Sequence, residues 1–215
     1  MSEQIPAVTP GPPDERFARA LAAIDAANAD DPQRIAVDGV PQPKELTHAR
    51  MLGAWVRRLD PAPSEALLLA AHAHHVRRWT IPRASYPAGR EAYLRWRRDL
   101  HTFHAAEAAR LLRGAGYDAT TIARVQKIVR KQRLTRNPAT TDPEVQTLED
   151  GLNLVFLETQ FDALIARLDD DAKAAAIVAK TWGKMSPRGH EAALALALSP
   201  RARAIVERAL AGDAP

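Results

Sequence analysis

The sequence predicts an all-α protein, and three observations support this prediction. Alanine and leucine are abundant among the 215 residues, whereas aromatic residues make up only 5%, and this bias favours helices. Apolar residues recur at the three- and four-residue spacing of amphipathic helices. The pairs Ser186-Pro187 and Ser199-Pro200 are typical of an N-cap followed by proline in the first turn. We therefore expect a compact orthogonal bundle of eight or nine helices.

The N-terminal half is expected to contain five helices, each marked by an apolar stripe or a stop signal. Phe17, Leu21 and Ile24 form the stripe of the first helix. Four prolines or glycines break the segment that follows, so a loop is expected there. Ser64 is placed to cap the third helix, and the fourth closes on Gly114 or Gly116. The expected ranges are 15–29, 43–59, 65–79, 90–113 and 121–133.

The C-terminal half continues in the same way. After a loop with two prolines, helices are expected over 148–168 and 171–182, the second ending at Gly183. Two short helices follow the Ser-Pro pairs. No strand pattern, repeat or heptad array emerges. We expect one domain over 15–211, preceded by a disordered tail at 1–14 and followed by a short tail at 212–215.

Composition excludes several classes of protein. The chain has no cysteine, which excludes disulfides and thiolate metal sites. No apolar run approaches the roughly 18 residues of a membrane span, and the first residues lack the pattern of a secretory signal. The expected location is therefore the cytoplasm, without a membrane partner.

Positive charge is concentrated in the middle of the chain. The net charge is +4, but residues 77–136 hold fifteen lysines and arginines against four acids, a local balance of +11. Such asymmetry predicts an anionic partner, either a small molecule or a nucleic acid. A solvated basic face is the alternative interpretation.

Histidines gather next to this basic segment. Five of the seven lie between Ala71 and Ala105. Helical spacing places His75 on the core-facing stripe of its helix and His104 in an inward seam with Arg97 and His101. Buried histidines are often ordinary core residues, but two successive helices carrying them favour a site. We expect the His75 and His104 imidazoles to converge on one pocket, near Asp150.

Carboxylates on other expected helices could complete a metal site. Neutral imidazoles with carboxylates suit Zn, Mn, Fe or Ni, so His75, His104, Asp150 and His48 are the candidate ligands, with Glu45 as a possible contributor. Asp150 also has a purely structural interpretation, because Thr147 to Asp150 matches a capping box.

The order of His48, His75 and Asp150 resembles that of the HD superfamily, which are helical, metal-dependent phosphohydrolases. Their ligands are a histidine on one helix, a His-Asp pair on another and a distant aspartate. This chain departs from the pattern because it has no His-Asp dipeptide, and Val76 follows His75. The resemblance implies an HD-like bundle and a divalent metal.

Several longer blocks resemble an uncharacterised family, domain of unknown function 4202. They are HHVRRWTIPRASYP, YLRWRRDL with the following FHA, QTLEDGLNLVFLE and KTWGKMS, and the similarity spans about residues 15–198. The family implies no established activity, but it draws attention to the histidine, arginine and tryptophan residues in these blocks.

The residues together suggest a metal-dependent hydrolase acting on a phosphorylated or nucleotide-like substrate. Arginine and lysine hold phosphate through charge-assisted bonds, and indoles offer flat faces for a base. Glu149 is the candidate general base, with Arg78 and Arg97 as catalytic cations. The candidate substrate-binding residues are Arg83, Tyr86, Trp79, Trp96, Lys180 and Lys184. A non-catalytic RNA-binding module, for example for tRNA, and a structural protein with a buried polar network are the alternatives.

Overall fold

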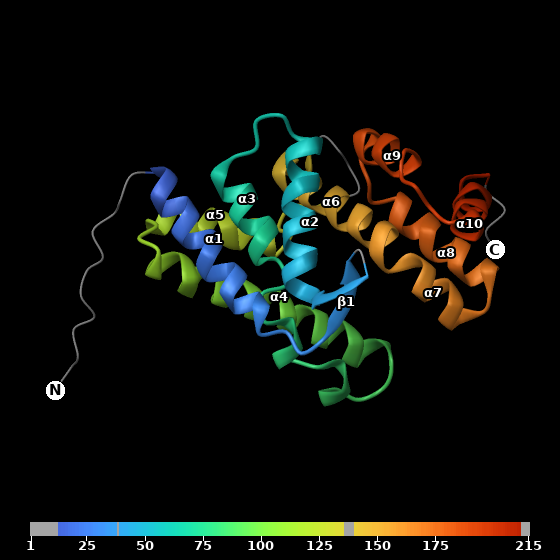
Figure 1. The fold of residues 1–215 in the computed structure, drawn as a ribbon, viewed down its shortest axis with the longest axis horizontal. Coiled ribbons are helices and arrows are strands. Elements are labelled where there is room, and N and C mark those ends of the chain that lie inside the picture. Colours follow the sequence, from blue (N-terminus) through green and yellow to red (C-terminus); the bar gives the residue numbers. More distant parts are fainter. Residues whose placement is uncertain (1–12, 38, 136–139, 212–215) are drawn as a thin grey trace. The chain divides into compact units, whose positions relative to one another are not determined.

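A computed structural model describes residues 13–37, 39–135 and 140–211. This part of the chain is mostly helical, with one two-stranded sheet (Figure 1). The all-α prediction is therefore confirmed. The described residues form two compact units, those within 13–53 and 63–132 (unit 1) and those within 54–62 and 133–211 (unit 2).

Unit 1 is built from five helices and the sheet. The helices are α1 (Pro13–Ala29), the first part of α2 (Lys44–Leu59), α3 (Glu65–Ala73), α4 (Arg90–Gly114) and α5 (Ala119–Val129). α3, α4 and α5 pack against one another, and α1 packs on α3 and α4. Their apolar stripes form the core of this unit.

The segment before α2 forms a hairpin, so the prediction of a loop there is wrong. β1 (Arg34–Val37) pairs antiparallel with β2 (Val40–Pro43), and β2 leads directly into α2 (Figure 1). Val37 is paired with Val40 across the turn, and Gly39 has a φ of +78°. That conformation suits glycine, and Asp-Gly between strands is a strong hairpin signal. The prolines of β2 cost little because each strand of a two-stranded sheet has a free edge.

α3 ends earlier than its periodicity suggests. The predicted Ser64 cap is present, with Ser64 Oγ accepting the Leu67 N–H at 3.1 Å. However, α3 stops at Ala73, and Arg77 adopts a left-handed φ of 53°. Two short 3₁₀ turns follow, η1 (Arg78–Thr80) and η2 (Arg83–Ser85). A left-handed residue cannot continue an α-helix, so residues 74–79 leave the helix that the sequence predicted.

Unit 2 holds α6 (Pro143–Thr159), α7 (Phe161–Leu168), α8 (Asp171–Trp182), α9 (Pro187–Leu194) and α10 (Pro200–Leu210). α8 has the predicted bounds, and serine residues cap α9 and α10 as expected. The helix predicted over 148–168 is instead two helices, because the φ and ψ of Gln160 leave the helical region.

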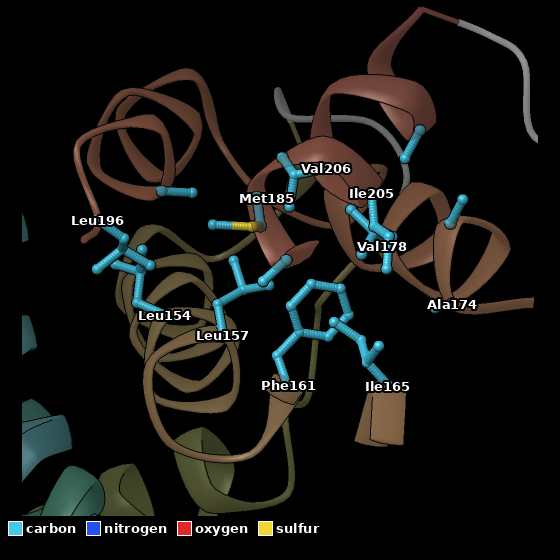
Figure 2. Packing of buried hydrophobic residues seen from close by; sticks show 14 of the residues in the cluster. Leu154, Leu157, Phe161, Ile165, Ala174, Val178, Met185, Leu196, Ile205 and Val206 are labelled. Atoms are coloured by element: carbon cyan, nitrogen blue, oxygen red, sulfur yellow. The ribbon is translucent and has the colours of Figure 1, made fainter. Parts of the chain in front are cut away.

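The core of unit 2 is formed by all of its helices around Phe161, which is fully buried (Figure 2). Leucines of α6 lie on one side of this ring, while Val178 of α8 and Ile205 of α10 belong to the same cluster. Within the described residues, no helix is long and apolar enough to cross a membrane.

Candidate functional site

Unit 1 contains a polar cavity of about 240 Å³. Its walls come from the hairpin region, the start of α2, the turns after α3 and one residue of α4. Three cations and two acids face it together with aromatic and apolar groups. The lining residues are Asp31, Gln33, Lys44, Glu45, Arg78, Trp79, Ile81, Pro82, Arg83 and Trp96.

The acidic wall is fixed by Asp31. Its Oδ2 accepts the Glu45 N–H at 2.9 Å, and its Oδ1 accepts the Gln33 N–H at 2.9 Å. Asp31 is 1% exposed, and it satisfies an N–H in the first turn of α2, where carboxylates are favoured. The side chain of Lys44 reaches Gln33 Oε1 at 3.3 Å. These contacts hold Lys44 and Glu45 at the cavity.

The basic wall comes from the η1 turn, which Arg77 initiates. Its left-handed backbone costs on the order of 1 kcal/mol, and Thr80 Oγ1 closes the turn by donating to the Arg77 carbonyl at 2.9 Å. The turn directs Arg78 and Trp79 to the cavity.

Arg78 is a cation of the cavity wall whose guanidinium N–H groups are available to a ligand. Its guanidinium lies 5.1 Å from the centre of the Trp96 ring, and Trp96 Nε1 donates to the Ile81 carbonyl at 2.9 Å. In the described part of the chain the Arg78 guanidinium forms neither a hydrogen bond nor an ion pair. Burial lowers the pKa of Arg78, although Glu45 opposes the shift. A partly desolvated cation of this kind favours an anionic partner.

His75 does not line the cavity, but it contacts the lining residue Glu45 and belongs to a cluster of imidazoles. Its Nδ1 lies 3.2 Å from Glu45 Oε2. This oxygen is buried and accepts no hydrogen bond from the described residues. The His75 ring lies 4.3 Å from the His74 ring and 5.6 Å from the His104 ring, measured between centroids. The imidazoles of His75 and His104 are therefore neighbours, while Asp150 belongs to unit 2.

The tautomer of His104 follows from its hydrogen bond. Nδ1 lies 3.0 Å from the Val76 carbonyl, which can only accept, so Nδ1 carries the proton and Nε2 presents a lone pair. His104 is 1% exposed, and its Nε2 has no hydrogen-bond partner among the described residues. A buried lone pair without a donor is costly, which points to a missing partner.

Burial keeps these imidazoles neutral. It lowers the pKa of His104 to about 4, against the Val76 hydrogen bond, which raises it. Burial also lowers the pKa values of His74 and His75 well below 6.5, and neighbouring cations, including Arg78 beside His75, act in the same direction. Neutral imidazole accepts a proton or binds a metal, whereas imidazolium does neither.

Two of the predicted substrate-binding residues form structural hydrogen bonds in and around the loop after α3. Arg83 donates to the carbonyls of Tyr86 and Pro87, at 2.8 Å each. The Tyr86 hydroxyl donates to Asp99 at 2.9 Å and does not line the cavity. Arg83 lines the cavity, but two nitrogens of its guanidinium already donate to the carbonyls of Tyr86 and Pro87. The positive charge of Arg97 lowers the pKa of Arg78, but Arg97 does not line the cavity.

The remaining predicted residues belong to unit 2. Glu149 and Asp150 are buried on α6, while Lys180 and Lys184 are exposed at the end of α8 and just beyond it. The capping box predicted for Thr147 to Asp150 is wrong. α6 begins at Pro143 and is capped by Asp142, whose side chain accepts the Glu144 and Val145 N–H groups.

The described residues contain no group of three or more His, Asp or Glu side chains arranged to hold a metal. His48 is buried in unit 1, where burial lowers its pKa. The metal ligands and the nucleic-acid alternative stay predictions.

Sequence reasoning missed Asp31, Lys44 and the ring contact of His74 with His75. Asp31 could have been noticed as an acidic residue near the start of α2, although nothing in the sequence shows that it accepts the Glu45 N–H.

Comparison with known proteins identifies the family and no activity. The family model described as a domain of unknown function (DUF4202) matches residues 18–206. The chain therefore belongs to this family, as the sequence blocks indicated. No curated protein and no solved structure matches the chain, so the HD resemblance is not confirmed.

Proposed function

We propose that this member of the DUF4202 family binds a small phosphorylated molecule in the cavity of unit 1 and hydrolyses its phosphate ester. One observation carries the proposal. The Arg78 guanidinium lies at the cavity wall without an ion pair in the described residues.

The phosphate group would be held by Arg78 with help from Lys44. Arginine binds phosphate through two parallel N–H···O bonds, and stacking on Trp96 restricts the guanidinium before the ligand arrives. Lys44 adds a second positive charge at the same cavity. An anion would offset the cost of burying Arg78.

His75 is the candidate general base. Its low pKa leaves it neutral at pH 7, and the Glu45 carboxylate near Nδ1 favours a proton on that nitrogen and a lone pair on Nε2. Nε2 would take a proton from water as the water oxygen attacks phosphorus. The P–O bond to the leaving alcohol then breaks, and the alcohol receives the proton.

Replacing Arg78 tests the phosphate site. Arg78→Gln is expected to weaken binding of inorganic phosphate by about tenfold or more, because a charge-assisted hydrogen bond contributes roughly 1.5–3 kcal/mol. Isothermal titration calorimetry measures the change. Arg113→Gln, at an exposed arginine in the last turn of α4, is the matched control. Equal affinity in Arg78→Gln and the wild type would exclude this site.

His75→Asn tests the chemistry separately. It is expected to slow hydrolysis of phosphate monoesters by about a hundredfold, with phosphate binding within a few fold of the wild type. Release of inorganic phosphate from a panel of monoesters provides the measurement. Hydrolysis that is absent in the wild type, or unchanged in His75→Asn, would contradict the catalytic assignment.

A second candidate mechanism uses a divalent metal held by His75 and His104, and the lone pair of His104 favours it. Metal-bound histidines commonly donate their other N–H to a carbonyl or carboxylate, as His104 does to Val76. His75 and His104 would hold the ion, which would lower the pKa of a water and so supply a nucleophile.

Zinc titration separates the two mechanisms. The metal mechanism predicts one bound equivalent on EDTA-treated protein and at least tenfold weaker binding in His104→Asn, which keeps a donor toward Val76 but lacks Nε2. His190→Asn, in unit 2, is the control. Binding below a tenth of an equivalent, with hydrolysis surviving in EDTA, would leave His75 as the base and exclude the metal.

A further inference from the structure

The Trp79 indole lies at the cavity, and the proposed phosphate site does not use it. It is half-buried, lies next to Arg78 in η1 and lines the cavity. In the described residues its ring stacks on no other ring or cation, and its N–H donates no hydrogen bond. A large apolar face held at a polar cavity favours a flat ligand group.

The other three tryptophans, all in the described part of the chain, have partners. Trp55 donates to Glu158 at 2.8 Å and lies against Arg58. Trp96 is hydrogen-bonded to Ile81 and stacked on Arg78. Trp182 stacks on His190, with ring centroids 4.0 Å apart and parallel planes. Trp79 is therefore distinguished by its lack of a structural partner.

Backbone geometry holds Trp79 beside the anion site. Arg77 keeps a left-handed conformation, and the turn it initiates directs two successive side chains, a guanidinium and an indole, to one cavity. Such strain is maintained when the surrounding structure requires it, and it is common at ligand sites. The cavity thus offers a phosphate-binding group and a stacking face from adjacent residues.

We propose that the ligand is a nucleoside 5′-monophosphate, with its base against Trp79 and its phosphate against Arg78. This proposal rests on the proposed function for the phosphate contact only. Any base can stack on an aromatic side chain. The proposal therefore names nucleotides as the ligand class without naming the base. At about 240 Å³ the cavity is smaller than sites that enclose drug-sized ligands, so a single nucleotide would fill it and extend to the solvent.

The test compares AMP, ribose 5-phosphate and inorganic phosphate by calorimetry on the full chain. The wild type should bind AMP about 5- to 150-fold more tightly than ribose 5-phosphate, the range expected from stacking of one base. Trp79→Leu should abolish this difference and leave ribose 5-phosphate binding unchanged, while Trp79→Phe should keep most of it.

The outcomes separate this inference from the proposed function. Equal affinities for AMP and ribose 5-phosphate in the wild type would overturn the nucleotide and leave the phosphate site standing. If Trp79→Leu bound neither AMP nor ribose 5-phosphate, Trp79 would only shape the cavity and would not recognise the base. No binding of any of the three would exclude both proposals. A single-stranded oligoadenylate that displaces AMP and binds more tightly would replace the mononucleotide with a nucleic acid.

Discussion

Lowering the pH from 7 to 4 is expected to cost the folded protein about 3 kcal/mol through His104 alone. Burial lowers the pKa of this imidazole to about 4 in the folded state, against about 6.5 in the unfolded chain. Between these values the unfolded state binds more protons, so stability falls as the pH falls. The full loss is reached below the folded pKa. His74 and His75, with pKa values lowered by burial, add to the loss in the same direction.

Urea unfolding at several pH values in EDTA measures the effect. His104→Asn, which cannot titrate in this range, should show a shallower decline of stability between pH 6.5 and 4. Val76→Ala is the matched control. It removes buried methyl groups from the residue whose carbonyl contacts His104 and should lower stability at every pH while keeping the wild-type slope. Identical slopes in His104→Asn and the wild type would contradict the neutral, buried state of His104.

The starts of α3, α9 and α10 could be predicted because a cap is a local interaction, whereas the helix expected from 148 begins at Pro143. Ser64, Ser186 and Ser199 each accept the N–H three residues later, within one turn of the chain. The end of α3 was predicted wrongly for the opposite reason. Its apolar spacing continues to Trp79, but the left-handed Arg77 stops the helix, and no local pattern indicates that a non-glycine residue takes this conformation.

Half of the candidate site could be predicted, and the other half depends on contacts between distant segments. The buried position of His104 follows from helical periodicity on α4. The contact between His75 and Glu45 joins residues thirty positions apart, and the pairing of Asp31 with the Glu45 N–H crosses the hairpin. Sequence also fails to show which arginines have free donors. Arg83 and Arg78 look equivalent, yet loop carbonyls occupy Arg83.

The hairpin shows a different limit, because its turn signal was present, but its glycine and prolines were interpreted as the marks of a loop. Asp38-Gly39 is a strong turn sequence, but Pro41 and Pro43 argue against a strand under the rules for central strands. The rule does not apply to a two-stranded sheet. A correct strand prediction therefore required the number of strands in the sheet, which depends on the tertiary structure.

Asp150→Ala is expected to lower the stability of unit 2 by about 2–4 kcal/mol. The Asp150 side chain, 2% exposed, accepts the Ser186 N–H at 2.9 Å, the Ser186 hydroxyl at 2.5 Å and the Gln146 amide at 2.9 Å. A Cβ at Gly189 would lie 2.8 Å from this carboxylate, so the first turn of α9 packs directly on it. Removing the acceptor leaves the partly buried donors of Ser186 and Gln146 unpaired, at a cost of about 1–3 kcal/mol each when fully desolvated.

Thermal or urea unfolding of Asp150→Ala, Asp150→Asn and the exposed control Glu207→Ala distinguishes the structural role of Asp150 from metal binding. Asparagine keeps one carbonyl oxygen for Ser186 and should recover part of the stability, whereas Glu207→Ala should stay within about 0.5 kcal/mol of the wild type. A structural carboxylate predicts that zinc affinity is unchanged in Asp150→Asn. Wild-type stability of Asp150→Ala combined with lost zinc binding would instead make Asp150 the metal ligand that its position in the sequence suggested.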